Sequence, residues 1–117
     1  MSIPKIMKAV VKKDVNTVKV ERVPVPQPGP GEVLVKINTG GVCASDLHLV
    51  REAFAYLQMR SGVRIAGHEG CGVVAALGER CAGVKLMDRV AVKWLSRTIS
   101  GKDLDGRFAE HAIAKAD

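Results

Sequence analysis

Two short segments of the sequence hold side chains that commonly bind metal ions. The first, residues 41–48, contains the thiol of Cys43 together with a hydroxyl, a carboxylate and an imidazole. The second, residues 67–70, contains the imidazole of His68 beside the carboxylate of Glu69, between glycines that let other groups approach the backbone. Thiolate sulfur and imidazole nitrogen are preferred zinc ligands, so the two segments predict a zinc site.

A catalytic zinc ion usually has three protein ligands and one position left for water or substrate. Cys43 and His68 would supply two ligands, while Glu69 could coordinate the metal or orient a ligand. Asp46 could hydrogen-bond a coordinating imidazole, and Cys71 is a candidate for a third thiolate. The residues alone leave an alternative open, in which the cysteines are small core residues and His68 is a hydrogen-bonded imidazole.

The composition predicts one globular domain spanning residues 1–117. Hydrophobic residues make up 47% of the chain and charged residues 26%, which is an ordinary balance. A chain of 117 residues is too short for a catalytic domain plus a nucleotide-binding domain. The net charge is +6, but the basic residues are scattered, and only two phenylalanines, one tyrosine and one tryptophan could stack on bases. We therefore expect no nucleic-acid partner.

The cysteine count and the hydropathy pattern favour a soluble, cytoplasmic protein. Three cysteines without a CxxC pair are a poor fit to a secreted disulfide scaffold, so a reducing compartment is expected. Residues 1–5 lack the apolar segment of a signal peptide, and no apolar run approaches the roughly 20 residues of a membrane span. We expect no membrane partner.

The apolar pattern predicts that strands deliver these side chains. Residues 6–25 are rich in β-branched side chains with near period-two alternation, which predicts a hairpin turning at residues 14–16. The prolines that follow indicate a stiff connector, because proline lacks the amide donor that a central strand needs. Many short strands of this kind suggest a closed or half-open β-barrel. Further strands are expected at residues 32–38, 72–78, 88–95 and 107–113.

One helix is predicted between the two candidate metal-binding segments. From Ser45 to about Gln58, apolar residues recur at spacings of three and four. Ser45 or Asp46 is suited to cap the first turn, which is also the simplest role for the Ser45 hydroxyl. His48 would then be an ordinary polar residue of this helix, unless it serves the metal site.

Four motifs occur along the chain in a specific order. They are Gly-Val-Cys-Ala-Ser-Asp-Leu-His at 41–48, Gly-His-Glu-Gly-Cys-Gly-Val-Val at 67–74, Asp-Arg-Val-Ala-Val-Lys-Trp-Leu at 88–95 and Gly-Arg-Phe-Ala-Glu-His at 106–111. In this order they resemble the N-terminal, GroES-like half of zinc-dependent medium-chain alcohol dehydrogenases, especially those of the yeast and fungal type. The resemblance implies a mainly β GroES-like barrel with one or two short helices, and no Rossmann domain within these residues.

The resemblance also implies roles for individual residues. Cys43 and His68 match the catalytic zinc ligands, and Glu69 matches a carboxylate that can enter or leave the coordination sphere. Ser45 matches the hydroxyl residue that bonds the substrate oxygen, and His48 matches the histidine that passes its proton to solvent. In that mechanism zinc acts as a Lewis acid, so that a bound alcohol ionises and releases hydride to a nicotinamide.

Several features depart from the family pattern. In relatives the third zinc ligand and the Rossmann domain come from beyond the segment matched here, so NAD(P) would bind only with a separate nucleotide-binding domain. The Gly-x-Gly-x-x-Ala string at residues 70–75 precedes a strand-like run, which is not typical of a dinucleotide loop. Relatives often carry four cysteines for a structural zinc where this chain has residues 96–105. Ala44 replaces a histidine that contacts cofactor phosphates, and Met87 replaces a glycine.

We therefore expect a zinc-type alcohol dehydrogenase-like oxidoreductase, represented by its catalytic domain, that interconverts small alcohols and aldehydes. We expect the chain to be inactive alone, and its expected partners are the substrate and either a nucleotide-binding domain or a second copy of the chain. Two alternatives remain. The chain is a non-catalytic interaction module or degenerate relative, or it is an incomplete fragment of a longer protein.

Overall fold

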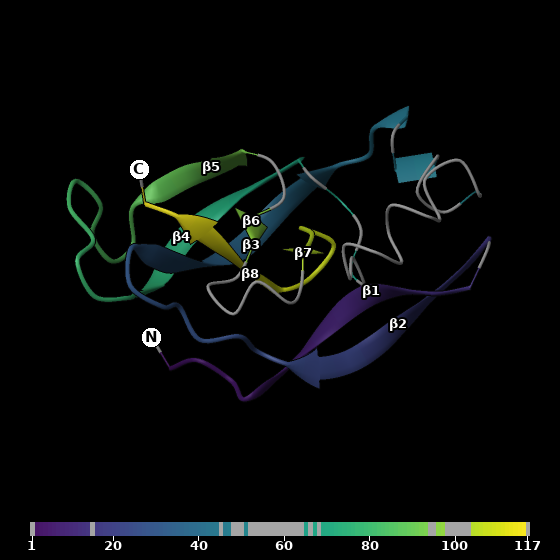
Figure 1. Cartoon of the computed structure of the whole chain (residues 1–117), viewed down its shortest axis with the longest axis horizontal. Helices are drawn as coiled ribbons and strands as arrows, with labels where there is room; N and C mark the ends of the chain where they lie inside the picture. Colours follow the sequence, from purple (N-terminus) through teal and green to yellow (C-terminus); the bar gives the residue numbers. More distant parts are fainter. Residues whose placement is uncertain are drawn as a thin grey trace.

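We analysed a computed structural model of the chain, in which residues 2–14, 16–44, 46–47, 51, 65, 67, 69–93, 96–97 and 104–116 are described. These residues form mainly β structure, as the sequence predicts (Figure 1). The strands are β1 (Ile6–Asp14), β2 (Thr17–Pro24), β3 (Glu32–Gly41), β4 (Glu69–Leu77), β5 (Arg89–Lys93), β6 (Ser96–Arg97), β7 (Leu104–Asp105) and β8 (His111–Lys115). In the part of the chain just defined, no helix has the length and apolar character that crossing a membrane requires.

A four-stranded antiparallel sheet in the order β5-β4-β3-β8 positions the candidate metal-binding segments. Strand β3 lies in the middle of this sheet, between β4 and β8 (Figure 1). Its pairing with β4 begins at Val33 opposite Leu77 and ends at Gly41 opposite Glu69. The end of β3 and the start of β4 therefore meet at one edge of the sheet.

The predicted hairpin is confirmed as β1 and β2, which lie beside the four-stranded sheet (Figure 1). Residues 14 and 17 face each other across the turn, where Asn16 has a φ of 54°. The hairpin is attached to the segment before β8, because the Val10 N–H donates to the Phe108 carbonyl at 2.7 Å. A bridge between Ala9 and Ala109 continues this attachment.

Two clusters of buried side chains form the core. Both arise because alternate residues of a strand point to the same face of its sheet. Apolar side chains on one face of each strand are thereby removed from water, which is the main stabilising contribution to such a fold. The hairpin cluster contains Met7, Ala9, Val11, Val23 and Ile65. The sheet cluster contains Val33, Val35, Val74, Val92 and Ala114.

The proline-rich connector enters β3 through a tight turn. The Glu32 N–H donates to the Gly29 carbonyl at 3.0 Å, and Gly31 has a φ of 74°. A positive φ at the third residue, with proline at the second, is typical of a type II turn. The turn fixes the point at which β3 begins, and β3 in turn leads to Cys43.

The Gly-x-Gly-x-x-Ala string at residues 70–75 lies within β4, so the strand predicted there is confirmed. A Cβ atom at Gly72 would overlap the carbonyl of Lys36 on β3. The glycine therefore permits close approach of two strands, in agreement with the interpretation of this string as something other than a nucleotide loop.

The expected helix lies mostly outside the described residues, and one expected strand begins later than predicted. Most of the helix expected from residue 45 to about 58 lies outside the described residues. Near its expected start, the Asp46 N–H donates to the Cys43 carbonyl at 3.0 Å and the Arg51 N–H to the Leu47 carbonyl at 2.8 Å. The strand expected at 107–113 begins only at His111. The residues before it contact other segments: the Arg107 N–H donates to the Gly67 carbonyl, and Ala109 forms an isolated bridge with Ala9 of β1.

Candidate metal centre

The Gly41–Glu69 pair brings the two candidate metal-binding segments together. Cys43 follows Gly41 by two residues, and Glu69 is the first residue of β4. A Cβ atom at Gly41 would lie 2.5 Å from Glu69 Oε2 and 3.2 Å from Glu69 Cβ. The exposed Glu69 side chain therefore lies over the Gly41 backbone, in space that only glycine leaves open.

The backbone around Cys43 is held by Asp46. The Cys43 N–H donates to Asp46 Oδ2 at 2.8 Å, and the Asp46 N–H donates to the Cys43 carbonyl at 3.0 Å. Asp46 is buried, whereas the Cys43 side chain is half-buried at the end of the strand. Asp46 is therefore not the N-cap that the sequence predicted: it lies in the first turn, and its carboxylate reaches back to the N–H of Cys43, as the third helical residue does in a capping box. It fixes the direction in which the chain leaves Cys43.

Three of the predicted site residues lie outside the described residues, namely Ser45, His48 and His68. Their roles as substrate, proton-relay and metal-binding residues stay predictions. The two neighbours of His68 in the sequence are described. Gly67 is buried and Glu69 is exposed.

Arg107 supports the segment that leads into β4, a role that its place in the motif at residues 106–111 did not indicate. Its side chain is 1% exposed, its N–H donates to the Gly67 carbonyl at 2.7 Å, and its Nη1 donates to the Ile113 carbonyl at 3.2 Å. Burial lowers the pKa of Arg107 from its ordinary value to about 10, because the charged form loses its hydration. A Cβ atom at Gly70 would lie 3.0 Å from Arg107 Cβ, so β4 packs closely on this side chain.

The interpretation of Cys71 as a core residue is wrong, because its side chain is exposed. Cys71 precedes Gly72 in β4, and Gly72 is buried against β3. Adjacent residues of a strand point to opposite faces of the sheet, so Cys71 points to the face opposite that of Gly72. Cys81 is half-buried and packs against the sheet cluster, and its Sγ donates to the Glu32 carbonyl at 3.3 Å. Among the described side chains, no three of His, Cys, Asp or Glu form a metal-binding group, so Cys71 gains no support as a third ligand.

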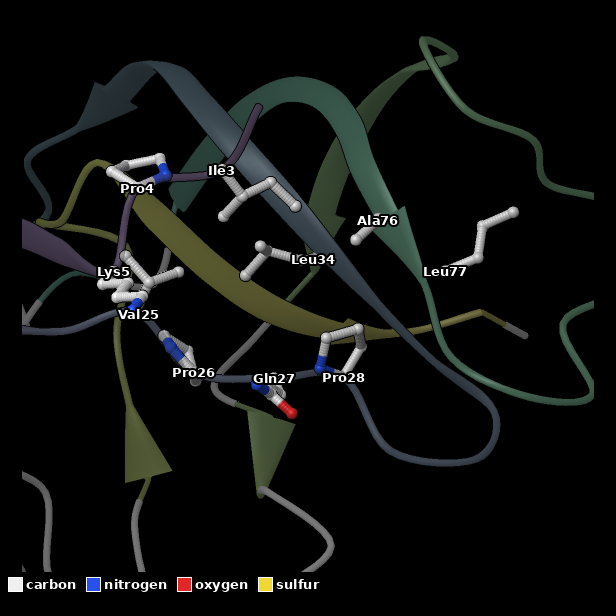
Figure 2. Close-up of a pocket in the computed structure, with 10 residues that line it drawn as sticks. All are labelled: Ile3, Pro4, Lys5, Val25, Pro26, Gln27, Pro28, Leu34, Ala76 and Leu77. Carbon is white, nitrogen blue, oxygen red and sulfur yellow. The ribbon is translucent and has the colours of Figure 1, made fainter. Parts of the chain in front are cut away.

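A cavity of about 600 Å³ lies away from these residues (Figure 2). Its wall includes Leu34 of β3 and Ala76 of β4, which pair with each other, and the connector residues Pro26 and Pro28. Leu34 lies near the start of β3, whereas Gly41 ends that strand. The cavity is therefore at the opposite end of the β3–β4 pair from Cys43.

The donor set at the described edge fits zinc. A thiol and a carboxylate are among the groups that zinc accepts, and both stand at the end where β3 and β4 meet. The thiol is half-buried and the carboxylate is exposed. The site lacks a described third ligand, which His68 would provide.

Comparison with known proteins identifies the family. The sequence model of one protein family, the alcohol dehydrogenase GroES-like domain, matches residues 29–117. An alcohol dehydrogenase of Rhizobium meliloti is 37% identical over 128 residues, which cover 93% of this chain and 37% of that relative. The chain spans less than half the length of this relative, and less than half the length of the two solved structures described in the next paragraph.

Solved structures share the fold. A thermostable alcohol dehydrogenase from Pyrobaculum aerophilum, bound to cobalt and zinc, has a TM-score of 0.76 and 25% identity, covering 95% of this chain and 40% of that one. A short chain alcohol dehydrogenase from E. coli CFT073, complexed with NADH, has a TM-score of 0.79 and 27% identity, covering 97% of this chain and 37% of that one. The expected fold and the family resemblance are thus confirmed, and the chain belongs to the family of alcohol dehydrogenase GroES-like domains.

Proposed function

We propose that the chain is the catalytic domain of a zinc-type alcohol dehydrogenase-like oxidoreductase, which interconverts small alcohols and aldehydes. The observation that carries this proposal is the pairing of Gly41 with Glu69, which brings the Cys43 segment and the Glu69 carboxylate to one edge of the sheet. The membership of the chain in the alcohol dehydrogenase GroES-like family supports the same reaction class.

In this proposal Cys43 and His68 would hold the zinc ion, and Glu69 would be the carboxylate available to it. When bound, zinc supplies Lewis-acid chemistry that lowers the pKa of a coordinated alcohol. Ser45 would accept a hydrogen bond from the alcohol hydroxyl and, as it takes that proton, release its own hydroxyl proton towards His48. His48 passes that proton to solvent, while the Asp46 contact with Cys43 N–H keeps the thiolate segment in place.

The oxidation also requires an acceptor for the hydride. The alcohol loses a proton from oxygen and a hydride from carbon, and the hydride reduces NAD⁺ or NADP⁺ while the aldehyde forms. We propose that a nucleotide-binding domain supplies this cofactor. The domain would belong to the same polypeptide or to a partner polypeptide, and the assembly could contain a second copy of this chain. The E. coli relative, which is complexed with NADH, supports a nicotinamide.

We further propose that the reaction takes place in the cytoplasm. The three cysteines, all of them among the described residues, form no disulfide, which suits a reducing compartment. The half-buried Cys43 thiol would stay available for a metal under those conditions.

A chimaera tests the proposed reaction. The chain replaces the matching segment of the Rhizobium meliloti alcohol dehydrogenase, and NADH formation from NAD⁺ and ethanol is followed. We expect turnover that Cys43→Ser lowers by at least about 1,000-fold, because the metal loses a ligand, and that Cys71→Ser leaves unchanged. A folded, zinc-containing chimaera whose activity is the same with Cys43→Ser would contradict the proposal. A chimaera that binds NAD⁺ but no zinc would favour a non-catalytic module.

A further inference from the structure

The aromatic ring of Phe108 lies against the residue that precedes His68. Gly67 has a φ of 91°, in the left-handed region that side chains other than glycine rarely adopt. A Cβ atom at Gly67 would lie 2.6 Å from Phe108 Cδ1, 2.8 Å from Cγ and 2.9 Å from Cε1. The ring therefore occupies the space where a side chain at Gly67 would be, and it limits where the backbone entering β4 can run.

The same edge of the ring faces the end of β3. A Cβ atom at Gly40 would lie 3.9 Å from both Phe108 Cδ1 and Phe108 Cε1, which is ordinary van der Waals contact. Gly40 precedes Cys43 by three residues and pairs with Gly70 of β4. The Phe108 ring thus contacts Gly40 and Gly67. These residues belong to the two segments that contain the predicted ligands Cys43 and His68.

The backbone on both sides of the ring is fixed. The Arg107 N–H donates to the Gly67 carbonyl at 2.7 Å, and the Phe108 carbonyl accepts the Val10 N–H at 2.7 Å. Ala109 then bridges Ala9 on the hairpin. These contacts tie the backbone of residues 107–109 to the β4 entrance and to β1, so the backbone that carries the ring is held beside Gly67.

We propose that Phe108 is a positioning residue for the metal centre, which sets the separation between the Cys43 segment and the His68 segment. This inference rests on the proposed function. Metal sites need their ligands held to within about 0.5 Å, and loss of a supporting contact typically weakens metal binding by 10- to 100-fold. Phe108→Ala removes the packing on Gly67 and opens space at Gly40, so both ligand segments gain freedom.

Zinc affinity, measured by competition with a chromophoric chelator, tests the proposal on the 117-residue chain. We expect Phe108→Ala to weaken zinc binding by about 10-fold or more. Phe108→Leu, which fills much of the same volume, should restore most of the affinity. Val74→Ala is the matched control, because Val74 is fully buried in the sheet cluster. It should lower the unfolding midpoint without changing zinc affinity.

A second measurement tests the ring contact without metal. In a double-mutant cycle on urea unfolding of the apo chain, Gly67→Ala should cost less stability in the Phe108→Ala background than in the unsubstituted chain, because removal of the ring leaves room for the new methyl group. Zinc affinity unchanged by Phe108→Ala and Phe108→Leu would overturn the inference and leave the proposed function standing. An unsubstituted chain that binds no zinc, or zinc binding insensitive to Cys43→Ser, would overturn the proposed function and this inference with it.

Discussion

Gly41 and Glu69 face each other across β3 and β4, and the Glu69 carboxylate occupies the place that a side chain at Gly41 would take. This relationship joins two segments whose predicted metal ligands, Cys43 and His68, are 25 positions apart in the sequence. It also explains why a carboxylate can reach the end of β3 while remaining exposed. The predictions below begin with this contact.

Gly41→Ala should displace the Glu69 carboxylate, because the new methyl group would stand 2.5 Å from Oε2. The flexible carboxylate can move, so we expect the free energy of unfolding to change by less than about 1 kcal/mol. Zinc affinity, measured by calorimetric titration, should fall. Gly40→Ala is the matched control, because its methyl group meets no atom closer than 3.4 Å. Equal zinc affinities in the two variants would contradict the proposed place of Glu69.

Met87→Gly should stabilise the chain. The Asp88 N–H donates to the Lys85 carbonyl at 3.2 Å and Met87 has a φ of 70°, so Met87 holds the position of a type II turn that glycine normally fills. Relief of left-handed strain, about 1–2 kcal/mol, exceeds the entropic cost of glycine, about 0.5–1 kcal/mol. Urea unfolding should show a gain of up to about 1 kcal/mol.

Leu86→Gly is the control for that variant, because Leu86 belongs to the same turn, is exposed and has no positive φ. We expect it to lower stability by about 0.5–1 kcal/mol. If Met87→Gly and Leu86→Gly lower stability alike, the account of strain at Met87 is wrong. The sequence comparison with the family singled out Met87 as a departure from glycine, and the backbone supplies the physical reason why that departure matters.

Gly72→Ala should strongly destabilise the fold. Its methyl group would overlap the Lys36 carbonyl, which belongs to the backbone of β3 and cannot rotate away. We expect a loss of about 1–3 kcal/mol in urea unfolding. The neighbouring variant Cys71→Ala should change stability by less than about 0.5 kcal/mol, because that side chain is exposed. A stable Gly72→Ala protein would mean that β3 and β4 are farther apart than described.

Acidification should destabilise the fold through His111. Burial lowers the pKa of His111. The positive charge of Lys36 lowers this pKa further, and the negative charge of Glu110 raises it, but the net shift is downward. The unfolded chain therefore binds the proton more readily, so stability should fall as the pH drops below the ordinary histidine value of about 6.5. Urea unfolding between pH 7.5 and 5 measures this slope, which His111→Gln should flatten. An identical slope in the variant would exclude His111 as its source.

The sequence predicted those features that depend on local pattern. Alternating β-branched residues predicted the hairpin. The motifs around Cys43 and Glu69, taken together, predicted the protein family. The exposed side chain of Cys71 was not predictable, because the glycines, valines and alanines of β4 give no clear alternation. The contact of Phe108 with Gly67 joins residues 41 positions apart, and only the tertiary structure reveals it.

The most direct test of the account is the absorption spectrum of the chain titrated with Co²⁺ under reducing conditions. The account predicts one Co²⁺ per chain, with a thiolate-to-metal charge-transfer band that disappears in Cys43→Ser and persists in Cys71→Ser. A band that survives in Cys43→Ser, or that is lost in Cys71→Ser, would contradict Cys43 as the thiolate ligand and with it the proposed metal centre.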